Sequence, residues 1–271
     1  MKIEILVSTM NQEDYKIIDT MHINSDAVVV NQCNKEERIE FQYKDHHVLW
    51  INTLERGLSN SRNMAMMNST ADICVLSDDD EVFKEDYIRT IKKAFQQNGD
   101  YDIIRFKING IEKTFKKYPD KSFRIGFLKS LKVSSVEIAF RRKEILKKHI
   151  KFDPLIGSGT KFPMGEENSF LFHCLRRKLK IKYIPEIIAD LHIGNSTWFT
   201  GYNKTYFVGR GAAFTSMSKW LAPFFILQFA VRKRKLYKNE LSFYESIKYM
   251  FQGRKEYIKN TSKNPIINTQ K

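Results

Sequence analysis

The sequence predicts an α/β protein with a doubly wound, mostly parallel central sheet and a helical, basic C-terminal extension. Three observations support this prediction. Short apolar runs alternate over residues 1–100 with helical patterns of about 10–15 residues, as in crossover units. A polar loop follows the apolar runs at residues 3–8, 27–30 and 73–76. Residues 201–271 contain instead an apolar stretch bounded by lysines and arginines.

The elements of the first part follow one another in a regular order. Residues 3–8 are the first predicted strand, and Thr9 begins the loop after it. Ser59 is expected to cap a helix over residues 60–68, because a serine hydroxyl can accept from the free amides of a helix start. The other predicted strands are residues 27–30, 48–51, 73–76 and 103–106, and the other predicted helices are residues 14–21 and 87–95.

Residues 108–190 have a less regular pattern. A loop is expected over residues 152–163, which include Gly157 and Gly159. The predicted strands are 137–140, 181–184 and 187–191, the last two on either side of Pro185, and the predicted helices are 143–148 and 168–179. We therefore expect one domain over residues 1–200, divided near residue 107, and a separate extension over residues 201–271.

The net charge of +15 is distributed unevenly along the 271 residues. Residues 1–100 hold 11 Lys and Arg against 18 Asp and Glu, which leaves a net charge of +22 on residues 101–271. This asymmetry indicates a negatively charged partner for the C-terminal part, such as a phospholipid surface, a lipid pyrophosphate or nucleic acid. The alternative is that the lysines simply solvate the surface.

Composition excludes several other classes of protein. With 42% hydrophobic and 28% charged residues, the chain is neither collagen-like nor wholly disordered. Its three cysteines are too widely spaced for a disulfide framework or a metal-ligand motif, which indicates buried thiols in a reducing compartment. The short N-terminal apolar run contains Glu4 and does not resemble a signal peptide. We therefore expect a cytoplasmic protein.

The most informative motif is Ser77-Asp78-Asp79-Asp80, which follows the apolar run at residues 73–76. Adjacent carboxylates repel one another unless a cation compensates them. Aspartates on a turn after a strand can bind Mg²⁺ or Mn²⁺ together with a diphosphate. The alternative is a solvated acidic turn before the next helix.

Three further motifs accompany the aspartates. The segment 57–63 combines a polar helix start with Arg62, which suits a phosphate or the edge of a base. Glu166 and Glu167 follow Gly165 at a predicted helix start, where a carboxylate either interacts with the helix dipole or acts as a general base. His192, at a strand end, is either structural or a metal ligand.

In this order, the motifs resemble one family. A strand leading to Ser8 and Thr9, the segment 57–63, the aspartate run and the Gly-Glu-Glu motif at 165–167 are similar to the family 2 inverting glycosyltransferases with the GT-A fold. Bacterial enzymes that build capsular, lipopolysaccharide or teichoic polymers are the most similar type. The resemblance covers about residues 1–200 and depends on the ordered set of motifs.

The resemblance implies a donor site and a metal cofactor. The donor would be a nucleoside diphosphate sugar, expected to be a UDP-sugar. Its binding residues would be Ser8, Thr9, Asn11, Asn31, Arg62, Asp78 and Asp79. The cofactor would be Mn²⁺ or Mg²⁺, with Asp80, Asp78 and His192 as ligands.

The same resemblance places the catalytic base at Glu167, with Glu166 beside it. The family usually has Asp at this position, and the extra methylene could move the carboxylate by about 1 Å, enough to change the rate. The family also commonly has an acidic turn after the second strand, whose Asp holds the nucleotide base. Here that turn is Asn31-Gln32-Cys33-Asn34, whose amides can also read the edge of a base.

The implied reaction moves one sugar, with inversion, to a hydroxyl of a saccharide acceptor. This acceptor is expected to be lipid-linked, at the inner face of the cell membrane, and no nucleic-acid partner is expected. Two alternatives stay open. A sugar-phosphate nucleotidylyltransferase also uses a doubly wound sheet with metal-binding Asp, but it normally has a Gly-rich phosphate loop after the first strand. A basic nucleic-acid-binding protein would explain the tail but not the aspartate run.

The apolar stretch at residues 220–231 is the main feature of the C-terminal extension. It is too short to span a bilayer, which takes about 20 residues. Four cations follow it at residues 232–235, which favours an amphipathic helix at an anionic membrane surface. The alternative is a helix that packs inside a C-terminal lobe or against a second subunit of a homo-oligomer.

Overall fold

The computed structural model describes residues 1–194 and 201–263. The chain divides into two compact units. The first contains residues 1–56, 60–149 and 174–196, and the second contains residues 57–59, 150–173 and 197–271. The domain boundary near residue 200 stays a prediction.

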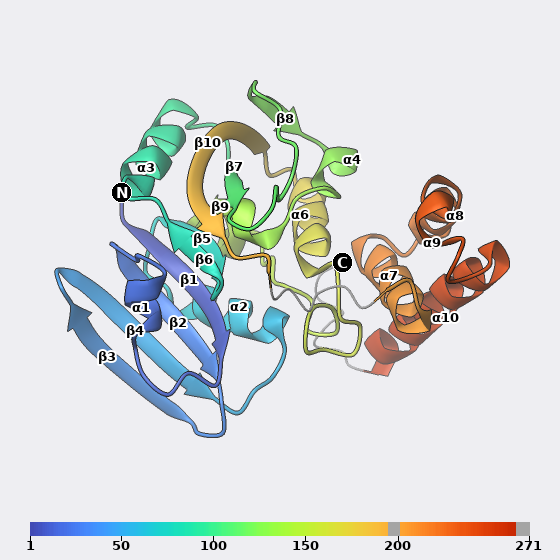
Figure 1. Ribbon diagram of the computed structural model, residues 1–271, viewed down its shortest axis with the longest axis horizontal. Helices are drawn as coiled ribbons and strands as arrows, with labels where there is room; N and C mark the ends of the chain where they lie inside the picture. The colour runs from blue at the N-terminus through green and yellow to red at the C-terminus, as the bar shows by residue number, and fades with distance from the viewer. Residues whose placement is uncertain (195–200, 264–271) are drawn as a thin grey trace. The chain divides into compact units, whose positions relative to one another are not determined.

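The first unit is built around one large sheet (Figure 1). Within the described residues it has ten strands, in the order β3-β4-β2-β1-β5-β9-β7-β10-β6, with β8 paired to β10. Strands β4, β2, β1, β5, β7 and β10 run in one direction and the other four run against them, so the prediction of a mostly parallel sheet is confirmed. The strands are β1 (Ile3–Met10), β2 (Asp26–Gln32), β3 (Glu37–Tyr43), β4 (His46–Thr53), β5 (Ile73–Asp78), β6 (Glu81–Phe83), β7 (Ile103–Gly110), β8 (Phe123–Ile125), β9 (Ile138–Arg141) and β10 (Ile181–Leu191).

Helices connect the strands and bury their apolar faces. In α3 (Tyr87–Gln97), Tyr87, Ile91 and Phe95 are buried at spacings of about one helical turn, and the lysines between them are exposed. The other helices up to residue 176 are α1 (Ile17–Thr20), α2 (Leu58–Asn68), α4 (Phe127–Ser130), the 3₁₀ turn η1 (Ser135–Glu137), α5 (Arg142–Lys147) and α6 (Glu166–Arg176).

The helices α7 (Lys204–Met217), α8 (Ala222–Arg232), α9 (Arg234–Tyr237) and α10 (Phe243–Lys263) belong to the second unit. Glycines let α7 and α10 approach closely. A Cβ on Gly211 would overlap the Met250 carbonyl, and one on Gly253 would overlap the Val208 carbonyl. No helix among the described residues is long and apolar enough to cross a membrane.

Several predictions about individual elements are wrong, for local reasons. Thr9 lies within β1 because its backbone is paired with Asn31 of β2, so the strand extends past residue 8. Ser59 lies inside α2 and donates its hydroxyl to the Ile156 carbonyl at 2.5 Å instead of capping the helix. The two strands predicted around Pro185 form the single strand β10, whose pairing with β7 shifts register there.

Three strands are missing from the sequence prediction: the short strands β6 and β8, and the seven-residue strand β3. Strand β3 lies at the edge of the sheet, with polar residues alternating between half-buried Ile39, Phe41 and Tyr43. The three cysteines are free and buried, as predicted.

Candidate active site

The predicted donor residues of the first unit meet at the carboxyl ends of three neighbouring strands. The register places Thr9 of β1 beside Asn31 of β2, and Ser8 of β1 beside Asp78 of β5. The aspartate run follows directly, because β5 ends at Asp78. Parallel strands thus bring together residues that are more than 20 positions apart in the sequence.

Two of the three aspartates have partners in this unit. Asp78 accepts a hydrogen bond from the buried Arg62 guanidinium at 2.8 Å, which forms an ion pair. Asp79 is exposed and accepts the Thr9 hydroxyl at 2.6 Å. The Thr9 hydroxyl in turn accepts from the Gln12 amide at 2.9 Å. Arg62 is therefore joined to an acidic residue of the predicted donor site.

Asp80 is different, because one of its carboxylate oxygens is buried and has no hydrogen-bond partner among the described residues. Burial raises the pKa of Asp80 to about 7, and the neighbouring charges of Asp78 and Asp79 add to the effect. A buried acidic oxygen without a donor is costly unless a cation approaches it. Of the three aspartates, Asp80 is therefore the one that a nearby cation would stabilise most.

Glu81 extends the acidic run into the protein and was not singled out from the sequence. One carboxylate oxygen accepts from the Ser77 hydroxyl at 2.7 Å and from the Asp78 amide at 3.1 Å. Its other oxygen is buried and without a partner among the described residues, and burial raises the pKa of Glu81 well above its usual value. Its position directly after the three aspartates was the available signal.

His192 is held beside this turn by its backbone. Its amide donates to the Asp80 carbonyl at 2.9 Å, and its Nδ1 lies 2.9 Å from a carboxylate oxygen of Glu112. Glu112 also accepts from the Ile193 amide at 2.7 Å. These hydrogen bonds, the one with His192 first, lower the pKa of Glu112 to about 2. Glu112 is a second residue that sequence reasoning missed, because 80 positions separate it from His192.

The predicted metal ligands do not form a preassembled cage. In residues 1–194 and 201–263, no group of three or more His, Cys, Asp or Glu side chains is arranged to hold a metal ion. Asp78 accepts from Arg62 through Oδ1 and His192 contacts Glu112 through Nδ1, whereas the buried Oδ1 of Asp80 has no partner in these residues and is the best placed donor atom. Mg²⁺-like ions are often held by one or two carboxylates, with substrate phosphates as further ligands. The residues therefore fit a cation that arrives with a diphosphate.

Asn31 is fully buried and its amide is held by the protein. Its Nδ2 donates to the Gln12 carbonyl at 2.9 Å and to Asn52 Oδ1 at 2.8 Å, and its Oδ1 accepts from the Gln12 amide at 3.0 Å. These bonds fix the loop after β1. In the same loop, Asn11, which precedes Gln12, has a left-handed backbone with φ of 52°. The hydroxyl of Ser8 accepts from Ser61 at 2.8 Å.

The two predicted catalytic glutamates belong to the second unit, at the start of α6. Glu166 is buried and Glu167 is half-buried. The loop before α6 passes close to Glu166, because a Cβ on Gly157 would lie 3.2 Å from the Glu166 Cβ. Gly157 has φ of +116°, a conformation that favours glycine. Glu166 is therefore the more tightly packed of the two carboxylates.

Known proteins share the fold and parts of the sequence. S. aureus TarS 1–349, solved in complex with UDP, has a TM-score of 0.62 at 11% identity over 93% of this chain and 81% of that one. Its structure with UDP-GlcNAc gives a TM-score of 0.60 at 12% identity over 89% and 74% of the two chains. At these identities the likeness concerns the fold, and it confirms the predicted fold class.

Sequence comparison identifies the family. The glycosyltransferase GlyA of Streptococcus pneumoniae serotype 4 (strain ATCC BAA-334 / TIGR4) is 31% identical over 102 residues, which are 34% of this chain and only 15% of GlyA. The family described as Glycosyl transferase family 2 matches residues 4–160, a segment that includes the aspartate run. These matches favour a glycosyltransferase over the nucleotidylyltransferase and the nucleic-acid-binding protein. The chain belongs to glycosyl transferase family 2.

Proposed function

We propose that the chain transfers a sugar from a UDP-sugar to a hydroxyl of a saccharide acceptor, with inversion at the anomeric carbon. The observation that carries this proposal is the acidic edge of the sheet, where Asp80 has a buried oxygen beside Asp78 and Asp79 that no described residue contacts by a hydrogen bond. This edge lies in the segment that matches the family. The TarS structures with UDP and UDP-GlcNAc support a uridine nucleotide as the donor's carrier.

The proposed cofactor is Mn²⁺ or Mg²⁺, held by Asp80 with Asp78 and His192 in the same unit. When bound, such a metal would neutralise the charge that develops on the leaving diphosphate. Arg62 fixes the Asp78 carboxylate, and Glu112 fixes the orientation of the His192 ring. The chain's own residues thus restrict the directions from which a diphosphate can approach.

The proposed general base is Glu167. It takes the proton from the acceptor hydroxyl as that oxygen bonds to the anomeric carbon. The bond between the anomeric carbon and the diphosphate oxygen breaks, and its electron pair leaves with the diphosphate. The lower burial of Glu167 supports this choice, because a base must reach an acceptor that enters from solvent. Glu166 packs against the loop of Gly157 and has the positioning role.

The proposed acceptor is a lipid-linked saccharide used in the synthesis of a cell-surface polysaccharide. The charge of residues 101–271, which is +22, supports this choice. A lipid-linked saccharide carries phosphate or pyrophosphate close to its sugars, and cations favour the approach of such anions.

The first test is nucleotide release from a panel of nucleotide sugars in the presence of Mn²⁺. We expect slow release of UDP from one UDP-sugar by the wild-type chain, and faster release once an acceptor is added. Glu167→Gln should keep donor binding but lower transfer by about 100-fold or more, the scale of a lost general base. Glu166→Gln is the matched control. A larger loss in Glu166→Gln would move the base by one residue.

The second test is thermal stabilisation by UDP with Mn²⁺. Asp80→Ala should abolish the Mn²⁺-dependent part of the stabilisation while the protein without ligands stays at least as stable, because a buried acidic oxygen with no donor among the described residues is removed. The exposed Asp45, in the turn between β3 and β4, provides the control Asp45→Ala. Unchanged Mn²⁺-dependent stabilisation of Asp80→Ala would contradict the metal assignment.

A further inference from the structure

The second unit presents an apolar stripe on helix α8 that nothing in the described chain covers. Its buried face is formed by Ala222, Phe225, Ile226 and Ala230. The opposite face exposes an apolar side chain on each turn, with exposed fractions of 47% to 65%: Leu221, Phe224, Leu227 and Val231. The preceding residue, Trp220, is 93% exposed. Helix α8 is therefore apolar on both faces, and only one of them belongs to the core of its unit.

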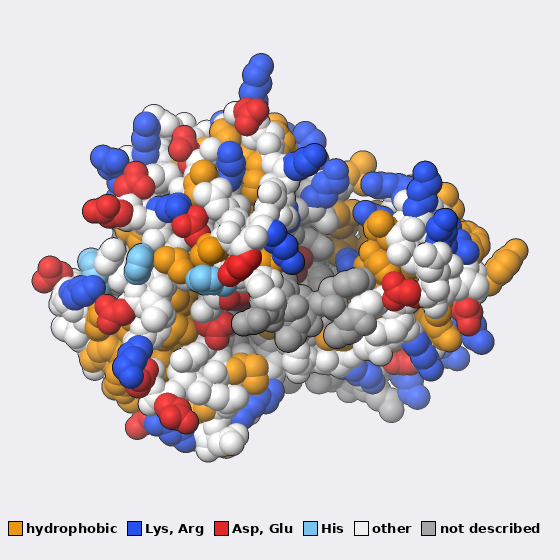
Figure 2. Space-filling view, in the orientation of Figure 1, with side chains coloured by type: hydrophobic (Ala, Val, Ile, Leu, Met, Phe, Trp, Pro, Cys, Tyr) orange, Lys and Arg blue, Asp and Glu red, His pale blue; other side chains and the backbone are white. Residues whose placement is uncertain are grey.

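Cations flank this stripe in the sequence, and the same stretch contains no acidic residue. Residues 218–238 contain six Lys and Arg and no Asp or Glu. Arg232, Lys233 and Lys235, at the end of α8 and in α9, are exposed and have no ion-pair partner in the described part of the chain. Arg234 donates to the Leu241 carbonyl and stacks on Tyr237, so it has a structural role. Figure 2 shows basic and apolar side chains side by side over the C-terminal helices.

The combination selects one kind of partner. A two-fold dimer through this stripe would bring two sets of unpaired cations together, and like charges oppose such an interface. Nucleic acid would meet the cations, and its bases can stack on Trp220 and Phe224, but it offers no apolar phase for the exposed aliphatic side chains of the stripe. An anionic bilayer satisfies both features, because apolar side chains enter the acyl boundary while Lys and Arg contact the headgroups.

We propose that α8 and α9 lie in the interface of an anionic membrane, with the stripe of Leu221, Phe224, Leu227 and Val231 buried among the lipids. Helix α8 has 11 residues and is about 16 Å long, which suits a helix in the membrane plane and not one that spans it. Trp220 at its start suits the headgroup level, where tryptophans gather. The binding is reversible, as expected of an amphipathic helix without a lipid anchor.

The test is co-sedimentation of the full chain with vesicles of phosphatidylcholine alone or mixed with phosphatidylglycerol. We expect binding to the mixed vesicles only, weakened by salt. Changing Arg232, Lys233 and Lys235 together to Gln should lower the partition coefficient by about 100-fold, since each cation contributes about 1 kcal/mol near an anionic surface. The matched control changes three exposed lysines of the first unit to Gln: Lys92, Lys93 and Lys143.

A second pair of variants tests the apolar stripe. Phe224→Ser should lower binding by at least 10-fold, because it removes the largest side chain of the stripe. Leu128→Ser, at a leucine of α4 that is 71% exposed, is the control and should bind like wild type. Circular dichroism verifies that each variant is folded.

The results separate this proposal from its rivals. Failure to bind anionic vesicles overturns it, as does binding that neither set of variants weakens. A stable dimer in light scattering that Phe224→Ser dissociates, without vesicle binding, would assign the stripe to a second copy of the chain. Nucleotide-sugar turnover is not part of these readouts, so failure here leaves the proposed reaction untouched, and the reverse also holds.

Discussion

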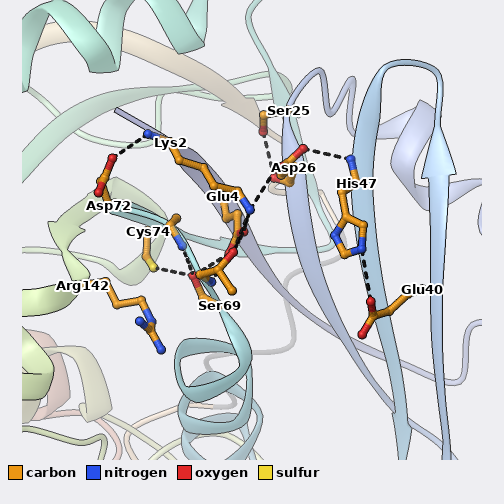
Figure 3. A network of polar contacts seen from close by, with 12 residues as sticks. Lys2, Glu4, Ser25, Asp26, Glu40, His47, Ser69, Asp72, Cys74 and Arg142 are labelled. Atoms are coloured by element: carbon orange, nitrogen blue, oxygen red, sulfur yellow. Dashed lines mark hydrogen bonds and ion pairs between the residues drawn. The ribbon is translucent and has the colours of Figure 1, made fainter.

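Glu4 is a buried carboxylate at the start of β1 whose removal has a predictable cost (Figure 3). Its oxygens accept from the Ser69 hydroxyl at 2.6 Å, from the Thr70 amide at 3.0 Å and from the Thr70 hydroxyl at 2.9 Å. Lys2 adds an ion pair at 2.7 Å. The residue thereby ties the first strand to the turn that follows α2. Asp72, in the same network, is 65% exposed and provides the natural control.

The size of the effect follows from these contacts. Glu4→Gln keeps the shape and one acceptor oxygen, but the new NH₂ group faces donors and the charge is lost. The Thr70 hydroxyl can rotate to accept, and Lys2 is 41% exposed and keeps Asp26 at 3.2 Å. We therefore expect the loss of about one charge-assisted hydrogen bond, a drop of about 2 kcal/mol in the free energy of unfolding. Asp72→Asn should cost less than about 0.5 kcal/mol, because exposed pairs contribute little.

The assay is urea unfolding followed by circular dichroism, repeated at several pH values. Burial raises the pKa of Glu4, but the hydrogen bonds from Lys2, Ser69 and Thr70 together outweigh it, and the net pKa lies below 4.5. A carboxyl with a lowered folded pKa stabilises the protein above its unfolded pKa and loses that contribution as the pH falls through the folded value. The gap between wild type and Glu4→Gln should therefore shrink below about pH 4.5. Equal losses in Glu4→Gln and Asp72→Asn, or a gap that widens in acid, would refute this reasoning.

Two further predictions concern backbone approach and buried amides. Gly253→Ala should lower the free energy of unfolding by about 1–3 kcal/mol, because its Cβ would overlap a backbone carbonyl of α7. Its control is Gly99→Ala, which would have nothing within 4 Å of its Cβ and should change the free energy of unfolding by less than about 0.5 kcal/mol. Asn31→Asp should lower the free energy of unfolding by about 1–3 kcal/mol in the same urea assay, because a carboxylate would face the Gln12 carbonyl that the Asn31 amide now contacts. The control is Asn34→Asp, at an exposed asparagine. Similar values for variant and control would contradict either prediction.

Much of the sheet was predictable because its central strands carry continuous apolar runs. All residues of β1 except Met10 are buried, and a strand buried on both faces has no polar alternation to obscure it. The edge strand β3 was missed for the opposite reason, since Ile39, Phe41 and Tyr43 alternate with polar residues. That alternation has the two-residue period of a half-buried strand, so β3 was predictable from its sequence pattern.

The candidate site was predictable only where it depends on strand ends. The parallel register explains why Thr9, Asn31 and Asp78 meet, and the sequence order of the runs already indicated it. The hydrogen bonds that decide how each side chain is used come from distant positions. The amide of Asn31 is held by Asn52, 21 positions away, and Glu112 holds a histidine 80 positions away. No local pattern records such pairs, because tertiary packing alone brings them together.

The four carboxylates of the acidic turn differ in how well the protein compensates their charge, and this difference bears on the proposed reaction. Asp78 is compensated by Arg62, and Asp79 by a hydroxyl donor. Asp80 and Glu81 each keep a buried oxygen without a donor among the described residues. Folding alone would favour neutral side chains at these two positions, because buried acidic oxygens without partners lower stability. A local rule that is broken without compensation is expected where a site serves function, and here a ligand that brings positive charge would relieve the cost.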